Sequence, residues 1–241
     1  MYLPIIIYAR GGSKRVPRKN IRPFCGKSLV EWAIIAAEHS KLASEIILTT
    51  DDDEIATVGE RHKIRIFRRP TMSDETPGSV PVFMALKILM QEKYFEEFIT
   101  MSPTAPLRLP EDLDNLISLY YGYGKPKGQG ALAVIYEKQI IFENTNKSTK
   151  YIHYKGDPNH LKESGLMGID PVDLWLKHEF SEGTQADKDS DRSMRRTRRL
   201  TAGSIPYIVK RWQYVDVDFP DEFDEAEWKF QKYILDKGYY K

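Results

Sequence analysis

Two clusters of charged residues have the types and spacing that chemistry on phosphate groups requires. Residues 9–20 read ARGGSKRVPRKN and directly follow the apolar run of residues 5–8. An apolar run that ends in two glycines and a series of cations is typical of a buried strand leading into an anion-binding loop. Gly11 and Gly12 allow positive φ angles, so that successive N–H groups can point at phosphate oxygens. We therefore predict that this loop binds a polyphosphate.

The positive charge of this loop is local and strong. It comes from Arg10, Lys14, Arg15, Arg18 and Lys19, and no acidic residue precedes Glu31 to neutralise it. The structural alternative is a solvated basic loop, because charge runs are commonly solvated surface. The two glycines and the preceding strand favour the anion site.

The second cluster, Asp216 and Asp218, lies near the end of the chain. Residues 205–217 have strand character, and side chains on a strand alternate between its two faces. The two carboxylates are therefore expected on one face, with Val215 and Val217 on the other. Two carboxylates at a strand end suit a hard divalent cation. The alternative, that Asp218 caps the last helix, leaves Asp216 unexplained.

A second acidic run occupies residues 51–54, DDDE, and follows the apolar strand at residues 45–50. It could form a metal site. Carboxylates in the first turn of a helix are stabilised by the helix dipole, and we prefer this structural interpretation.

Apolar periodicity predicts the elements that position these clusters. We expect strands at residues 5–8, 45–50, 64–67, 98–101, 131–136 and 205–217. We expect helices at residues 28–40 with Ser28 as the cap, from residue 51, through 82–89, at 110–122 with Pro110 in the first position, and through 223–234. Alternating strands and helices indicate an α/β fold with a mostly parallel sheet, whose ligand lies over the carboxyl ends of the strands.

Composition restricts the classes of function. The 241 residues suit one domain, and 36 Lys and Arg nearly balance 35 Asp and Glu, which argues against a general nucleic-acid binder. No apolar run approaches the roughly 20 residues of a membrane span, and we find no secretion signal. The single cysteine, Cys25, excludes an internal disulfide framework and a thiolate metal cluster. We expect a cytoplasmic protein that binds neither nucleic acid nor membrane.

Residues 5–34, IIIYARGGSKRVPRKNIRPFCGKSLVEWAI, resemble the N-terminal signature of the CMP-sialic acid synthetases, or acylneuraminate cytidylyltransferases. The resemblance implies a three-layer, Rossmann-like, mostly parallel sheet of the nucleotide-diphospho-sugar transferase type, within a single domain of residues 1–241. It implies transfer of CMP from CTP to the anomeric hydroxyl of an acidic nine-carbon sugar, with release of pyrophosphate. It also implies Mg²⁺ or Mn²⁺ on Asp216 and Asp218, and a homodimer formed through an insertion at residues 137–164.

The resemblance also assigns site residues by position. Arg10, Lys19 and Asp216 are the expected catalytic residues. The nucleotide is expected to contact Arg10, Gly11, Gly12, Ser13, Arg15, Lys19, Asn20, Arg69 and Ser79. The sugar is expected to contact Ser102, Thr104 and Arg108. Without the resemblance, Ser79 would be interpreted as the N-cap of the helix through residues 82–89, and it could fill both roles.

Two departures from the family pattern concern the sugar. Ser102 stands where the family usually has Gln, and the paired arginines expected before Ser164 are missing. Legionaminic, pseudaminic and octulosonic acids are therefore alternative acceptors, and a nucleotide-binding homologue without catalysis is an alternative of another class. The Asp pair favours the enzyme, because a binder needs no carboxylates beside a polyphosphate. A dinucleotide oxidoreductase is excluded because Gly11-Gly12 followed by cations is not G-x-G-x-x-G.

Residues 181–199, SEGTQADKDSDRSMRRTRR, form a charged segment with little apolar content. Such a segment cannot bury enough surface to fold alone. We interpret it as a flexible lid or a solvated insertion. Binding of RNA or a membrane through its arginines is the less favoured alternative.

Overall fold

A computed structural model describes residues 2–73, 76–136, 140–145, 148–153, 161–177 and 204–240. The predicted charged loop at 181–199 and parts of the predicted insertion at 137–164 lie outside these ranges. No helix in the described ranges is both long and apolar enough to cross a membrane.

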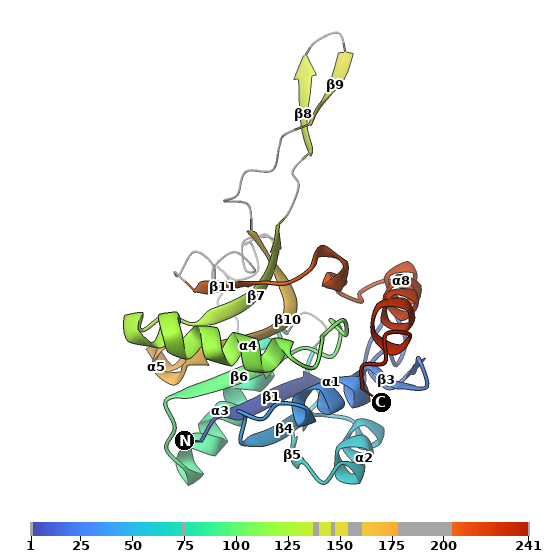
Figure 1. The fold of residues 1–241 in the computed structure, drawn as a ribbon. Helices are drawn as coiled ribbons and strands as arrows, with labels where there is room; N and C mark the ends of the chain where they lie inside the picture. Colours follow the sequence, from blue (N-terminus) through green and yellow to red (C-terminus); the bar gives the residue numbers. More distant parts are fainter. Residues whose placement is uncertain are drawn as a thin grey trace.

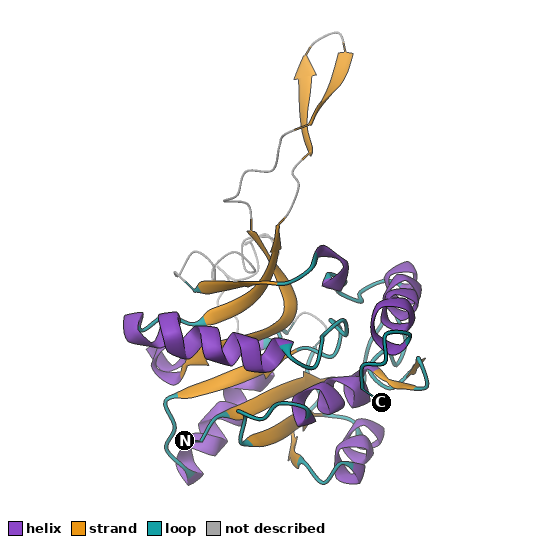
Figure 2. Cartoon of the chain, in the orientation of Figure 1, coloured by secondary structure: helices purple, strands orange, loops and turns teal. Residues whose placement is uncertain are grey.

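The predicted alternation of strands and helices is confirmed (Figures 1 and 2). The strands are β1 (Pro4–Ala9), β2 (Pro23–Phe24), β3 (Lys27–Ser28), β4 (Glu45–Thr50), β5 (Arg65–Arg68), β6 (Glu97–Met101), β7 (Ala131–Tyr136), β8 (Ile140–Thr145), β9 (Ser148–His153), β10 (Leu161–Pro171) and β11 (Ile205–Ile208). The α-helices are α1 (Leu29–Glu38), α2 (Asp53–Arg61), α3 (Ser79–Glu92), α4 (Asp112–Leu119), α5 (Val172–Lys177) and α8 (Pro220–Phe230).

Seven of the described strands form one sheet, in the order β11-β7-β10-β6-β1-β4-β5. β1 pairs in parallel with β4 and β6, and β5 and β11 extend the two edges in parallel. Only β10, among the described strands of this sheet, runs antiparallel to its neighbours. The sheet is therefore mostly parallel, as predicted, and β5 lies at its edge.

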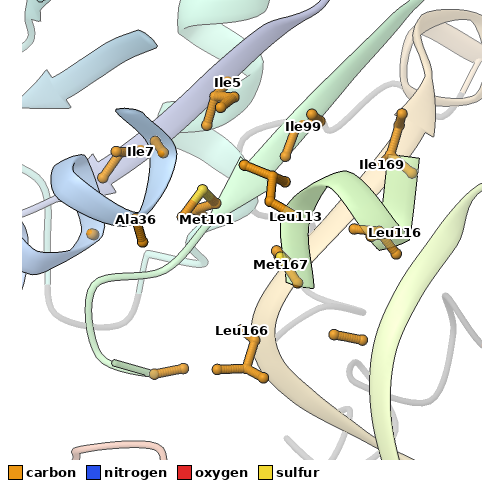
Figure 3. Close-up of a cluster of buried hydrophobic side chains, with 14 of the residues drawn as sticks. Ile5, Ile7, Ala36, Ile99, Met101, Leu113, Leu116, Leu166, Met167 and Ile169 are labelled. Carbon is orange, nitrogen blue, oxygen red and sulfur yellow. The ribbon is translucent and has the colours of Figure 1, made fainter. Parts of the chain in front are cut away.

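The inner strands β1 and β6 are buried on both faces, and helices cover both. Ile5 and Ile7 of β1 point into a core with α1 and α4, whereas Ile6 between them points into a second core with α3 and α5. Figure 3 shows the first core, in which Ile99, Met101 and Ile169 from the strands meet side chains of α1 and α4. Alternation with a period of two thus produces the three-layer fold.

The last helix packs away from the main cores. Phe223, Phe230 and Ile234 bury against Phe24 of β2 and Trp32 of α1, and Val215 and Val217 belong to the same cluster. This packing fixes the chain that precedes α8 against the loop that follows β1.

Three local predictions need correction. The strand predicted at 205–217 ends at Ile208 and is followed by a 3₁₀ turn at Arg211–Gln213. α4 begins at Asp112, with Pro110 before its cap. α3 begins at Ser79 itself, so Ser79 is not its N-cap. The alternative in which Asp218 caps α8 is not observed: Phe219 is the N-cap, and the carboxylate of Glu222 accepts the backbone N–H groups of Asp218 and Phe219. Ser28 does cap α1, as predicted.

Candidate active site

Four loops lie together at the carboxyl ends of the strands, because parallel strands end on the same side of the sheet. β1 leads into residues 10–20, β4 into Asp51 and Asp52, β5 into Arg69, and β6 into residues 102–108. The extended segment before α8 joins them through a hydrogen bond from Val217 N–H to the Thr104 carbonyl, 2.8 Å long. All residues predicted to bind the nucleotide, the sugar or the metal therefore lie on loops at the carboxyl ends of the strands or at the start of α3.

The glycine at position 11 is required for a different reason from the predicted one. Positive φ in this loop occurs at Arg18, at 58°, and not at Gly11 or Gly12. A Cβ atom on Gly11 would lie 2.2 Å from the Asp52 carboxylate, and the Gly11 N–H donates to Asp51 Oδ1 at 3.0 Å. Gly11 thus allows close approach of the loop to the start of α2.

Three cations of the loop, Arg15, Arg18 and Lys19, pair with acids from elements far away in the sequence. Arg18 bonds the Asp52 carboxylate and lies 2.8 Å from Glu54. This raises the pKa of Arg18, and it holds the pKa of Asp52 below its ordinary value although burial acts to raise it. At the other side of the loop, Asp218 lies 3.0 Å from Lys19 Nζ and 3.3 Å from Arg15.

Lys19 is the most buried cation of this loop, with 7% of its surface exposed. Its ammonium group donates to the Val217 carbonyl and to Asp218, so it bridges the loop and the segment before α8. Burial of an ammonium is costly unless it is paired. The structure thus brings together the predicted catalytic lysine and a predicted metal ligand that is about two hundred residues away in sequence.

Three buried side-chain atoms in the described residues have no hydrogen-bond partner: Ser13 Oγ, Asn20 Oδ1 and Arg69 Nε. Buried polar groups are almost always hydrogen-bonded, so each exception needs an explanation. All three belong to residues predicted from sequence to contact the nucleotide. Asn20 is held in place because its amide group donates to the Arg10 carbonyl at 2.9 Å.

A chain of hydroxyl groups leads to Asp216. Ser102 Oγ lies 2.9 Å from Thr104 Oγ1, which donates to Asp216 Oδ1 at 2.9 Å. The loop after β6 therefore orients one of the two predicted metal ligands, a contact that the sequence did not indicate.

The two carboxylates keep the predicted alternation although their segment is not a strand. Val215 and Val217 are buried, whereas Asp216 and Asp218 are partly exposed. No group of three or more His, Cys, Asp or Glu suited to a metal occurs in the described residues. The pair nevertheless fits Mg²⁺, which is commonly bound by one or two carboxylates together with waters and substrate phosphates.

Arg108 is placed differently from the prediction. It is fully buried, and its guanidinium donates to the carbonyls of Leu166 and Ser102. Burial lowers the pKa of this guanidinium. Arg108 therefore fastens the loop after β6 to β10.

Ser79, at the start of α3, lies beside the end of β1. A Cβ atom on the preceding Gly78 would lie 2.7 Å from the Tyr8 ring, so the first turn of α3 approaches β1 closely. Ser79 is partly exposed at this position.

The sequence matches the family model described as cytidylyltransferase over residues 4–159. The chain belongs to the cytidylyltransferase family. Pseudaminic acid cytidylyltransferase of Campylobacter jejuni is 40% identical over 187 residues, covering 73% of this chain and 81% of that protein. CMP-N,N'-diacetyllegionaminic acid synthase of Legionella pneumophila is 30% identical over 129 residues, covering 52% and 56%.

Solved structures share the fold of this cytidylyltransferase. CMP:2-keto-3-deoxy-manno-octonic acid synthetase, solved with CTP, matches with a TM-score of 0.69 at 15% identity, covering 97% of this chain and 100% of that chain. 4-Diphosphocytidyl-2C-methyl-D-erythritol synthase matches with a TM-score of 0.68 at 9% identity, covering 95% and 100%. These matches confirm the predicted Rossmann-like fold, and family membership confirms that the chain is a nucleotidyltransferase.

Proposed function

We propose that this cytidylyltransferase transfers CMP from CTP to the anomeric hydroxyl of an acidic 2-keto-3-deoxy sugar of the nonulosonic type. The sugar oxygen bonds to the α-phosphorus, the bond from that phosphorus to the β-phosphate oxygen breaks, and pyrophosphate leaves while the hydroxyl loses its proton. The observation that carries the proposal is the set of unpartnered buried atoms on Ser13, Asn20 and Arg69. A nucleotide would supply the hydrogen-bond partners that these groups lack.

The cations of the first loop account for the chemistry on phosphate. Arg10 and Lys19 bind the phosphates and stabilise the charge that develops as pyrophosphate leaves. Attack by an alcohol on a polyanion requires alignment and charge neutralisation more than covalent catalysis. Arg15 and the backbone of Gly11 and Gly12 complete the phosphate contacts.

We propose Mg²⁺ or Mn²⁺ as the cofactor, held by Asp216 and Asp218. When bound, the ion supplies charge neutralisation at the α-phosphate and favours loss of the proton from the sugar hydroxyl. The hydroxyl of Thr104 holds the Asp216 carboxylate in position through its 2.9 Å hydrogen bond. Asp218 keeps Lys19 and Arg15 beside the same phosphates.

The identity of the acceptor sugar is inferred from the relatives and from the loop after β6. The relatives named for pseudaminic and legionaminic acid favour a bacterial nonulosonic acid over sialic acid. Ser102, where the family usually has Gln, lies at the end of the hydroxyl chain that reaches Asp216. We expect Ser102 and Thr104 to face the sugar.

We also propose that the enzyme is a homodimer. β8 and β9 form an antiparallel pair that stands apart from the large sheet (Figure 1). An isolated two-stranded hairpin is marginally stable in water, so a partner subunit would explain why this pair is present. A cytoplasmic location stays a prediction of the sequence.

The function is tested by measuring pyrophosphate release from CTP with pseudaminic, legionaminic, N-acetylneuraminic and 3-deoxy-manno-octulosonic acids. We expect turnover with a nonulosonic acid, its loss with EDTA, and its recovery with Mg²⁺ or Mn²⁺. Asp216→Asn should abolish turnover while the protein stays folded. CTP binding by calorimetry without turnover on any sugar would support the nucleotide-binding homologue instead.

A further inference from the structure

The acidic run at residues 51–54 is a sequence motif that the proposed function does not use. We propose that Asp51 is a positioning residue of the nucleotide site, whose buried carboxylate fixes both the loop backbone at Gly11 and the guanidinium of Arg69. This inference rests on the proposed function, because both of these groups are taken to face CTP.

The contact with the loop backbone is direct. Asp51 Oδ1 accepts the Gly11 N–H at 3.0 Å, across forty residues of sequence. On the neighbouring residue, the Asp52 carboxylate occupies the space that a side chain at position 11 would need. Gly11 is therefore held by one carboxylate and approached closely by the next, which sets the direction of the N–H groups that follow it.

The contact with Arg69 is a buried ion pair. Asp51 Oδ2 lies 3.5 Å from Arg69 Nη1, and the two side chains are 5% and 6% exposed. The guanidinium also donates to the Pro70 carbonyl at 3.2 Å and to the Ala9 carbonyl at 3.4 Å, while its Nε atom has no partner. Arg69 is therefore anchored at its terminal nitrogens and leaves Nε for a ligand.

Electrostatics explain why a carboxylate is needed at position 51. Burial lowers the pKa of Arg69, the charge of Asp51 raises it, and the nearby charge of Arg10 lowers it. A buried cation beside a second cation is stable only with a paired anion. Asp51 supplies this anion and lets two arginines lie side by side at the phosphate and nucleoside parts of the site.

The test is a double-mutant cycle on CTP binding, measured by calorimetry on the full chain. Asp51→Asn keeps the side-chain shape and an acceptor for the Gly11 N–H but removes the charge that holds Arg69. We expect Asp51→Asn and Arg69→Met each to raise the Kd for CTP about tenfold or more. The double variant should bind no more weakly than Arg69→Met alone, because Asp51→Asn acts through Arg69.

The contribution through Gly11 is tested by Asp51→Ala, which removes the acceptor as well. Compared with Arg69→Met alone, Asp51→Ala combined with Arg69→Met should bind CTP more weakly, and equal affinity would overturn the contribution through Gly11. Asp53→Asn is the matched control, because the Asp53 side chain is 96% exposed and its ion pair is with Arg68, outside the proposed site. Its CTP affinity should equal that of the wild type.

The outcomes separate this inference from the proposed function. A wild-type protein that does not bind CTP overturns the proposed function. A wild-type protein that binds CTP, with additive losses in the cycle, overturns only the role of Asp51. If Asp51→Asn does not fold, Arg69→Lys replaces it: a cation stays beside Asp51 but the Nε donor is lost, so CTP should bind about tenfold more weakly. Unchanged affinity in this variant would overturn the inference.

Discussion

At the scale of single residues, Lys19 is the cation of the predicted site whose position is most closely fixed by its neighbours. Its ammonium group is buried between the Val217 carbonyl and the Asp218 carboxylate, so its position is fixed before any phosphate binds. A charge that is already in position contributes more to a transition state than one that must reorganise.

We therefore predict that Lys19→Ala lowers kcat by about a hundredfold or more, with little change in the circular dichroism spectrum. The measurement is pyrophosphate release at saturating CTP. Lys27→Ala is the control, because Lys27 pairs with Glu31 outside the site and its removal should leave kcat unchanged. Turnover of Lys19→Ala within a few-fold of wild type would remove Lys19 from the catalytic residues.

Cys25 gives a second prediction at this scale. Burial raises the pKa of the Cys25 thiol to about 11, and only the thiolate reacts with alkylating agents. At pH 8 the native protein should therefore react with iodoacetamide about a hundredfold more slowly than the unfolded protein, whose thiol has a pKa of about 8.5. Mass spectrometry with and without denaturant measures the two rates.

The raised pKa of Cys25 also makes the stability of the folded protein depend on pH. The folded protein holds the thiol proton more tightly, so this contribution to stability is complete below about pH 8.5 and is lost as the pH rises towards 11. Equal labelling rates in native and denatured protein at pH 8 would contradict the assigned burial.

At the scale of elements, Asp112 connects the start of α4 to the chain that leads to the Asp pair. Its buried carboxylate accepts from the Leu109 N–H at 2.7 Å, from Gln213 at 2.6 Å and from Tyr207 at 3.0 Å. Burial raises the pKa of Asp112, and these three hydrogen bonds act against that shift. Asp112 thus anchors the 3₁₀ turn that stands where the sequence predicted a continuous strand.

We predict that Asp112→Ala lowers the free energy of unfolding by about 2 kcal/mol, because it leaves buried donors without an acceptor. Urea denaturation followed by fluorescence measures the change. Glu111→Ala is the matched control, since the neighbouring Glu111 is exposed and makes no capping bond. Equal stability of the two variants would show that Asp112 is not an anchor.

At the scale of the whole molecule, the sheet and its two helical layers account for the body of the protein, and the β8–β9 pair stands outside that body (Figure 1). The predicted dimer places this pair against a second subunit. The aromatic and apolar content of residues 151–154 predicts that they lie in this interface; residues 151–153 end β9, and Tyr154 lies outside the described residues.

We predict that the full chain is a dimer by light scattering at micromolar concentration. Replacing residues 140–153 with a short Gly-Ser linker should give a monomer, because β8 and β9 would be absent. Unchanged circular dichroism of the remaining sheet is the control for folding. A monomeric wild-type protein would contradict the dimer.

The sequence by itself predicted six of the seven strands of the large sheet and a candidate site in the loop after the first of them. Local patterns carry this information: the apolar run before Gly11, the Ser28 cap and the alternation of Val215 and Val217 with the two aspartates each depend only on nearby residues. The same patterns placed the polyphosphate loop at the end of the first strand, and family resemblance supplied the nucleotide.

Only the tertiary structure decided which polar and charged groups contact one another. Lys19 and Asp218, Gly11 and Asp51, and Arg108 and Leu166 are pairs far apart in sequence, and strand order and direction determine each pair. The sequence predicted neither β10 nor its antiparallel direction, so the burial of Arg108 against this strand could not be foreseen. Packing likewise explains why position 11 requires glycine, because the Asp52 carboxylate occupies the space that a side chain there would need. Asp52 follows β4, the next strand of the large sheet along the chain.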